Sequence, residues 1–182
     1  MFTPILHSVS YAGVWPGQAR LSLHEFLDKA AGLGFPALML MAKRPHASLL
    51  DFDSGERGKL RAALRERGLR CAILAGYNNF SADAEHGDIP QREIQILYVT
   101  ELARLAHDLQ APLVRIFTAY EHPQAPYPAL WQAVVDALGE CARRAAPYGV
   151  TLAVQNHHDL AAGYEALFDL LQAVGEPNCR AA

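Results

Sequence analysis

The sequence has few cysteines, no excess of basic residues and no long apolar run. Its three cysteines, Cys71, Cys141 and Cys179, stand far apart without CxxC spacing, so they predict neither a zinc knuckle nor a disulfide framework. Lysine and arginine together number 16 against 19 aspartates and glutamates, which gives a net charge of −3. A chain with this balance lacks the basic field that nucleic acid or an anionic membrane would require.

No stretch reaches the roughly 18 apolar residues of a transmembrane helix. The N-terminus "MFTPILHSVS" also lacks the basic start and apolar run of a signal peptide. We therefore expect a cytoplasmic protein whose cysteines are buried thiols in a reducing compartment. A hydrophobic content of 51% over 182 residues predicts one globular domain, residues 1–182, with a single core.

Short apolar runs recur along the chain at the spacing of strand–helix units. Five of them read "PILHSVS", "PALMLMA", "RCAILAG", "PLVRIFT" and "VTLAVQN", and they start at Pro4, Pro36, Arg70, Pro112 and Val150. A sixth, "NCRAA", starts at Asn178, and successive starts lie 28 to 42 residues apart. That interval is the length of one strand followed by one helix.

Amphipathic helical patterns with readable ends separate these runs. "SLHE" at residues 22–25 fits a capping box, and Gly34 ends the helix that follows. The third helix opens in "DIPQRE", where Asp88 can cap it and Pro90 fits its first turn. Its predicted apolar stripe comprises Ile94, Leu97, Leu102, Leu105 and Leu109. Other helices are predicted around residues 60–64, 128–147 and 167–174.

Apolar strands that alternate with amphipathic helices predict an α/β fold with a parallel sheet covered by helices. An open doubly wound sheet and a (β/α)8 TIM barrel both fit this order. The segment "SVSYAGVWPG" after the first run is not G-x-G-x-x-G, which disfavours a dinucleotide-binding sheet. We therefore favour the barrel. Eight units usually need about 250 residues, so we expect a barrel truncated to about its first five and a half units, with open edges and a half-exposed interior.

In such folds ligands bind at the C-terminal ends of the strands, and polar residues cluster there in this sequence. Lys43 and His46 can clamp a phosphate or hydroxyls, Tyr77 can flank a sugar ring, and Asn78 can hydrogen-bond its hydroxyls. Arg115 lies inside the fourth run, so it is either paired in the barrel interior or directed at substrate. The predicted substrate-binding residues are His7, Lys43, His46, Tyr77, Asn78, Arg115 and Asn156.

The segment "VTLAVQNHHDL", residues 150–160, concentrates this polar character at the end of the fifth run. Gln155 ends the run, where its side chain can project into the barrel mouth. His157 and His158 follow in the loop, where a histidine can transfer protons near neutral pH or ligate a metal. Two histidines before an aspartate also occur in ordinary surface loops, so the pattern is only moderately specific.

"YGVTLAVQNHHDL" followed by "LLQAVGEPNCRAA" resembles the sugar phosphate isomerase/epimerase family, the xylose-isomerase-like TIM barrels. "LMAKRPHASLLDFD" and "GYNNFSAD" resemble a branch of the same family, and the likeness covers essentially the whole chain. The resemblance implies a (β/α)8 fold with one divalent cation (Mn, Mg, Co or Zn) at the barrel mouth. It also implies aldose–ketose isomerisation or epimerisation through proton abstraction next to a carbonyl.

The sequence departs from that family in its expected metal ligands. Gln155, an uncharged and weaker ligand, stands where the family has its first glutamate, and the later ligands would lie beyond Ala182. The resemblance therefore implies a metal site at Gln155 that is complete only with further C-terminal ligands. It also implies catalytic roles for His157 and His158 in the intact protein, and an inactive 182-residue piece.

The leading hypothesis is thus a sugar or sugar phosphate isomerase or epimerase that assists proton abstraction with a metal. A non-catalytic sugar-binding barrel that has lost its carboxylate base is one alternative. An apurinic-site endonuclease-like hydrolase on the same fold is another, although the acidic balance argues against it. The expected partner is a small sugar or sugar phosphate rather than nucleic acid or membrane, and a homo-oligomer is left open.

Overall fold

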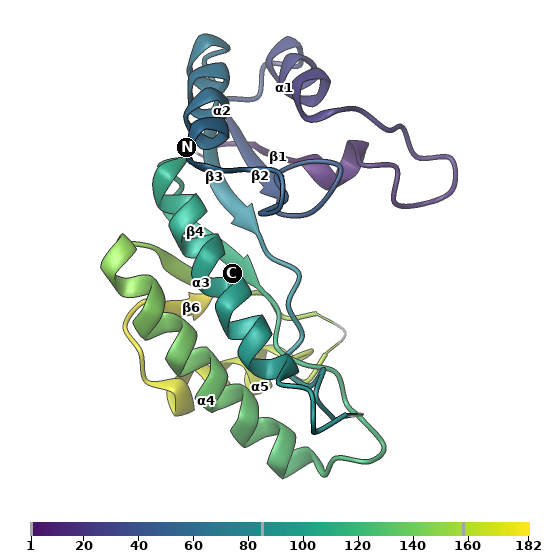
Figure 1. The fold of residues 1–182 in the computed structure, drawn as a ribbon, viewed down its shortest axis with the longest axis vertical. Helices are drawn as coiled ribbons and strands as arrows, with labels where there is room; N and C mark the ends of the chain where they lie inside the picture. Colours follow the sequence, from purple (N-terminus) through teal and green to yellow (C-terminus); the bar gives the residue numbers. More distant parts are fainter. Residues whose placement is uncertain (1, 85, 158) are drawn as a thin grey trace.

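The computed structural model describes residues 2–84, 86–157 and 159–182, which form one sheet of six parallel strands (Figure 1). The strands are β1 (Ile5–His7), β2 (Ala37–Met41), β3 (Arg70–Ala75), β4 (Leu113–Ile116), β5 (Thr151–Val154) and β6 (Cys179–Ala181). Their order in the sheet follows their order in the chain, and every neighbouring pair is parallel. The parallel sheet expected from the repeating pattern is confirmed, including the sixth strand.

Helices connect the strands in the same rhythm. The α-helices are α1 (Leu23–Gly32), α2 (Ser54–Glu66), α3 (Gln91–Asp108), α4 (Tyr127–Ala145) and α5 (Tyr164–Val174). Two short 3₁₀ helices, η1 (Ser8–Tyr11) and η2 (Ala146–Tyr148), follow β1 and α4. None of the helices in the described ranges is long and apolar enough to cross a membrane.

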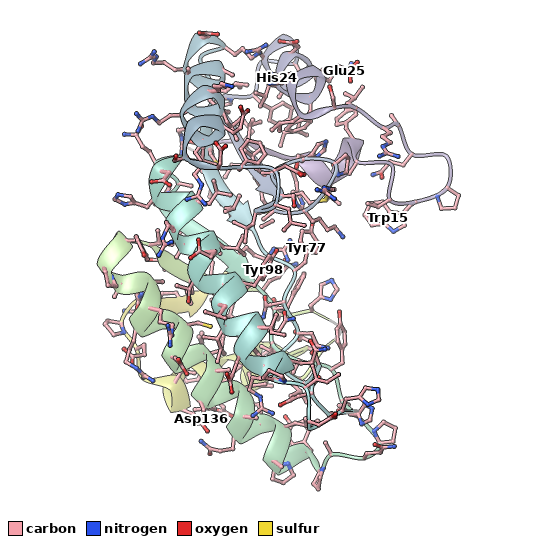
Figure 2. The ribbon with its side chains drawn as sticks, viewed as in Figure 1. Trp15, His24, Glu25, Tyr77, Tyr98 and Asp136 are labelled. Atoms are coloured by element: carbon pink, nitrogen blue, oxygen red, sulfur yellow. The ribbon has the colours of Figure 1, made fainter. Side chains whose placement is uncertain are left out.

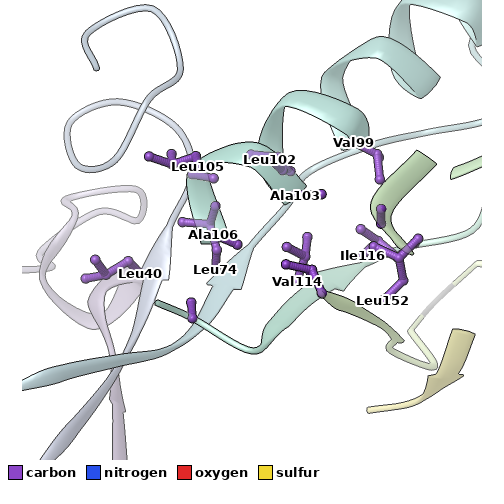
Figure 3. Close-up of a cluster of buried hydrophobic side chains, with 14 of the residues drawn as sticks. Leu40, Leu74, Val99, Leu102, Ala103, Leu105, Ala106, Val114, Ile116 and Leu152 are labelled. Atoms are coloured by element: carbon purple, nitrogen blue, oxygen red, sulfur yellow. The ribbon is translucent and has the colours of Figure 1, made fainter. Parts of the chain in front are cut away.

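The core lies between the sheet and its helices. Figure 3 shows Leu102, Leu105 and Ala106 of α3 above the strand side chains that face them. Those strand residues, Leu40, Leu74, Val114, Ile116 and Leu152, are fully buried. Parallel strands need crossover connections, and here the crossovers are helices that lie on one face of the sheet. These helices therefore remove the apolar side chains of that face from water.

Helix α3 corrects two details of the sequence prediction. Asp88 does not cap it, because the helix begins at Gln91 with Pro90 as the N-cap and without a side-chain cap. Ile94 and Leu97 of the predicted stripe are 47% and 58% exposed. The buried face instead runs through Ile96, Val99, Leu102, Ala103, Leu105 and Ala106. Leu102, Leu105 and Leu109 of the predicted stripe are buried as expected. The prediction has the wrong phase only in the first half of the helix, where Ile96 and Val99 face the sheet.

The first apolar run also ends earlier than its composition suggested. Strand β1 stops at His7, and the chain turns into η1 at Ser8. The buried Ser8 hydroxyl accepts a hydrogen bond of 2.8 Å from the backbone N–H of Met41 at the end of β2. A side chain thus continues the link between the two strands where the backbone pairing ends.

The sheet remains open, as expected for an incomplete barrel. Strands β1 and β6 are its two edges. On the face opposite the core, Met39, Ile73 and Leu113 are only partly buried and line a hollow of about 430 Å³. A closed barrel fills this space with layers of side chains.

The N-terminus of α1 provides a stability test. The Ser22 hydroxyl accepts from the N–H of Glu25, and the Glu25 carboxylate accepts from the N–H of Ser22. Replacing Ser22 by alanine removes one half of this box and should lower the free energy of unfolding by about 1 kcal/mol. Urea denaturation measures the loss. Ser54→Ala, at an exposed first turn where serine is not the cap, is the control, and an equal loss in both variants would contradict the capping role.

Candidate functional site

A pocket of about 450 Å³ opens at the C-terminal ends of the first five strands. Its polar lining comprises His7 from β1, Lys43 after β2, Tyr77 after β3, Arg115 from β4, and Gln155 and His157 after β5. Trp15, Met39 and Phe117 supply apolar walls. Figure 2 shows Trp15 on the projecting segment between η1 and α1. The structure therefore brings together six of the residues predicted from the sequence.

Arg115 is the most enclosed charge in this pocket, with only 4% of its surface exposed. Its Nη1 donates to the carbonyl of Gly76 at 2.9 Å, and the N–H of Gly76 donates to the carbonyl of Arg115 at 2.7 Å. The guanidinium carbon lies 4.2 Å from the centre of the Phe117 ring. Burial lowers the pKa of Arg115, and the neighbouring Tyr77 opposes this change.

Gly76 permits this close approach of β3 and β4. A Cβ atom at Gly76 would lie 2.8 Å from the Leu102 side chain and 3.1 Å from the carbonyl oxygen of Arg115. Both distances are shorter than ordinary contact, so a larger residue here would displace the Leu102 side chain and press on the β4 backbone where Arg115 is anchored.

The Tyr77 ring makes cation–π contacts with two side chains. The Lys43 Nζ lies 4.0 Å from the ring centre and the Arg115 guanidinium carbon lies 5.1 Å from it. Cations over an aromatic face are attracted by its quadrupole. Burial raises the pKa of the Tyr77 phenol, although the charge of Arg115 opposes this change.

Tyr98 of α3 supports the pocket from behind and was missed by the sequence analysis. Its hydroxyl accepts from the N–H of Tyr77 at 3.3 Å and donates to the carbonyl of Ala42 at 3.0 Å, tying the ends of β2 and β3 together (Figure 2). Burial raises the pKa of Tyr98 to about 12, so the phenol stays protonated and able to donate. A tyrosine on the apolar side of α3 was the only signal in the sequence.

His7 is an uncharged histidine at neutral pH. Burial, followed by the nearby charges of Arg115 and His46, lowers the pKa of His7 from 6.5 to about 4. Its Nε2 is buried and makes no hydrogen bond within the described parts of the chain. The imidazole can therefore offer this nitrogen to a bound molecule.

The segment after β5 enters the pocket through Gln155 and His157. The backbone N–H of Gln155 donates to Ile116 at 3.0 Å, and the His157 ring lies 4.6 Å from the Phe117 ring, centre to centre. Asn156 is exposed, and its amide donates to Ala162 at 3.3 Å. Asn156 lines the neighbouring hollow on the inner face of the sheet instead. His158, the second predicted catalytic histidine, lies outside the described residues.

His46 and Asn78 do not line the pocket, contrary to the roles assigned from the sequence. The His46 Nε2 donates to the carbonyl of Leu21 at 3.1 Å, and its ring stacks on Phe26 with centres 5.6 Å apart. Both amide atoms of Asn78 bond to the backbone of Phe117, at 2.7 and 3.0 Å. These hydrogen bonds hold the loops after β2, β3 and β4 in place, while the buried Nδ1 of His46 has no hydrogen-bond partner among the described residues.

The described residues do not fit a complete metal site. No group of three or more His, Cys, Asp or Glu side chains within them is placed to hold a cation. Gln155 and His157 share the pocket, but no carboxylate of residues 2–84, 86–157 or 159–182 lines it. The nearby Asp159 accepts from the backbone N–H groups of Thr118 and Ala161, at 3.0 and 3.2 Å. The predicted metal role of Gln155 stays a prediction.

A sequence model of xylose isomerase-like TIM barrels matches residues 27–182 of the chain. No curated protein sequence matches significantly. Among solved structures, a xylose isomerase domain protein from Alicyclobacillus acidocaldarius is 19% identical with a TM-score of 0.74, covering 98% of this chain and 61% of that one. D-psicose 3-epimerase with D-tagatose, from Clostridium cellulolyticum H10, is 17% identical with a TM-score of 0.76, covering 97% and 61%.

The IolI protein, solved with a bound zinc atom, is 15% identical to the chain with a TM-score of 0.76, covering 96% of this chain and 60% of that one. The chain thus spans about 60% of the length of these three structures. Identities this low show a shared fold, and that fold includes the parallel strands whose ends form the pocket.

The low pKa of His7 predicts a pH-dependent stability. The unfolded chain takes up the His7 proton near pH 6.5, but the folded chain does so only near pH 4. This contribution to stability is therefore present above about pH 6.5 and is lost as the pH falls toward 4. Urea denaturation at pH 7.5 and pH 5 should show a larger loss in the wild type than in His7→Asn. A His7 resonance titrating near 6.5 in the folded protein would contradict the burial argument.

A second prediction concerns Gln155. Replacing it by glutamate adds a carboxylate to a pocket whose described lining has none, so Mn²⁺ or Zn²⁺ should bind about tenfold more tightly or better. Isothermal titration calorimetry measures the affinity. Gln172→Glu on the exposed side of α5 adds the same charge elsewhere and should leave metal binding unchanged. Equal affinities in the wild type and Gln155→Glu would argue that Gln155 does not face the metal position.

Proposed function

The chain belongs to the xylose isomerase-like TIM barrel family, and on that premise we propose that the protein is an isomerase or epimerase of a sugar or sugar phosphate. The observation that carries this proposal is the single pocket that collects polar side chains from the ends of five parallel strands. Binding at that edge is the rule for barrels of this kind. The pocket holds two histidines, which can act as a base or hydrogen-bond substrate, and two cations, which can stabilise negative charge on a carbonyl oxygen.

In the proposed reaction, His157 removes a proton from the carbon next to the substrate carbonyl. The His157 ring rests against Phe117 at the pocket wall, which holds it in place. His7, kept neutral by burial, hydrogen-bonds a substrate hydroxyl or carbonyl through its Nε2. Delivery of a proton to the opposite face of the same carbon, by a donor on that face, gives an epimer. Delivery to the former carbonyl carbon, with transfer of the hydroxyl proton from the adjacent oxygen to the former carbonyl oxygen, gives an isomer. A positioned general base of this type contributes roughly 10²- to 10⁴-fold to a rate.

The positive charges assist the same step. Loss of a proton beside a carbonyl leaves negative charge on the carbonyl oxygen, and cations fixed in a water-poor pocket stabilise such charge. Lys43 and Arg115 both line this pocket and both contact the Tyr77 ring, at 4.0 and 5.1 Å from its centre. Because the described donors do not form a cation site, no step of this proposal is assigned to a metal ion.

A non-catalytic sugar-binding protein is a second candidate. The observation that favours it is the pocket lining, in which Gln155, His7 and His157 are present and the described residues supply no carboxylate base. Such a protein would bind a sugar through the same side chains but would not exchange its protons.

Proton exchange separates the two candidates. A ketose panel, fructose and fructose 6-phosphate among them, is incubated with the intact protein in D₂O, and deuterium entering the carbon next to the carbonyl is followed by NMR. We expect exchange above the buffer rate for at least one substrate, and a fall of about 100-fold or more in His157→Asn. The stability of this variant should change little, because a half-buried loop side chain contributes little packing.

His24→Asn is the matched control, since His24 is an exposed histidine of α1 away from the pocket. It should exchange protons at the wild-type rate. Exchange that survives unchanged in His157→Asn would remove His157 from the base role. Sugar binding without exchange in the wild type would leave the sugar-binding protein as the answer.

A further inference from the structure

Arg115 is a buried cation that has no carboxylate partner within the described parts of the chain. The other arginines that form ion pairs in the described chain, such as Arg57 with Asp108 at 2.8 Å and Arg67 with Asp28 at 2.6 Å, each meet an acidic side chain. Arg115 is far more enclosed, yet no aspartate or glutamate among the described residues forms an ion pair with it. Its Nε is also buried without a hydrogen-bond partner among these residues. Buried charges are normally paired, so this arrangement calls for a counter-ion.

The surroundings of Arg115 do not supply that counter-ion. The Lys43 ammonium shares the Tyr77 ring with Arg115, so a second positive charge lies close by. His7 is neutral, and an imidazole cannot supply a negative charge in any case. The described pocket lining contains no carboxylate at all. Two cations in one partly enclosed pocket repel each other unless an anion lies between or beside them.

The free side of Arg115 also has the shape to bind an anion. Nη1 is held by the Gly76 carbonyl, which fixes the plane of the guanidinium, and Phe117 covers its face. The edge that carries Nε is the edge with which arginine binds carboxylate or phosphate in a bidentate manner. A structural role in capping the Gly76 carbonyl would explain the hydrogen bond of Nη1. It would not explain why the guanidinium charge and the Nε–H are buried without a partner among the described residues.

We propose that the substrate carries a carboxylate or phosphate group, and that Arg115 binds this group with Lys43 at the pocket mouth. The inference rests on the proposed function only in taking this pocket as the place where the substrate binds. It narrows the substrate from sugars in general to sugar acids and sugar phosphates. The anion completes the charge balance of the pocket and anchors one end of the substrate, while the histidines face its carbonyl.

Binding measurements on the whole chain test this inference without requiring turnover. The probes are glucose, gluconate, glucose 6-phosphate and inorganic phosphate, titrated by calorimetry and by NMR. We expect gluconate or glucose 6-phosphate to bind about tenfold more tightly than glucose or better, the effect of one charge-assisted hydrogen bond. Whichever of the two binds more tightly identifies carboxylate or phosphate as the natural group.

Four variants locate the effect. Arg115→Met should remove the preference for the anionic probe, and Arg115→Lys, which keeps the charge but loses the planar edge, should restore part of it. Lys43→Met should lower anion affinity by a smaller factor, because Lys43 is exposed and screened by salt. Lys29→Met, an equally exposed lysine of α1, is the control and should bind every probe as the wild type does.

Circular dichroism establishes that each variant is folded. If Arg115→Met fails to fold, Lys43→Met still tests the proposal, because its exposed side chain makes no contribution to the core. Equal affinity for glucose and for both anionic probes in the wild type would overturn the inference, as would an anion preference that both Lys43→Met and the Arg115 variants retain. Proton exchange on a neutral ketose with no anion preference would uphold the proposed function and reject this inference. Selective anion binding without proton exchange on any substrate would uphold this inference and reject the proposed function.

Discussion

Parallel pairing of the strands is the constraint on which the rest of the structure depends. Each strand pairs with the next in chain order, so every strand ends at the same edge of the sheet. Residues separated by up to 150 positions, from His7 to His157, therefore meet around one pocket. The backbone hydrogen bond from Gly76 to Arg115 continues the β3–β4 pairing past the last residue of β3, and the bond from the Arg115 side chain back to Gly76 fixes the middle of that edge. Without this shared direction the polar residues would be scattered over two ends of the sheet.

The electrostatics of the pocket follow from its burial. Enclosure disfavours charge, which is why His7 remains neutral and why the pKa of Arg115 falls. A guanidinium stays protonated even so, because its ordinary pKa is very high. The outcome is a pocket with positive charge and no carboxylate among the described residues, a composition that suits an anionic sugar better than a metal cation. The neutral Gln155 belongs to the same pattern, since it adds an oxygen to the pocket without adding negative charge.

Several polar residues near the pocket serve the backbone rather than a ligand. Tyr98 joins the ends of β2 and β3, Asn78 holds the backbone of Phe117, and Asp159 holds Thr118. Loops carry backbone groups that no strand or helix satisfies, so side chains must provide the missing partners. This demand explains why a cluster of polar residues at the strand ends is larger than the set that lines the pocket.

The sequence by itself determined the order of strands and helices, the capping box at Ser22 and the glycine ends of the helices, because these depend on local periodicity and on backbone conformation at single residues. It also placed His7, Lys43, Tyr77, Arg115, Gln155 and His157 at strand ends, since position along a βα unit is a local property. Only the tertiary structure decided that His46 and Asn78 turn to backbone partners, that α3 buries its alanines, and that Arg115 has no acidic partner among the described residues. These outcomes depend on which atoms from distant segments come within a few ångströms of each other, and no pattern along the chain contains that distance.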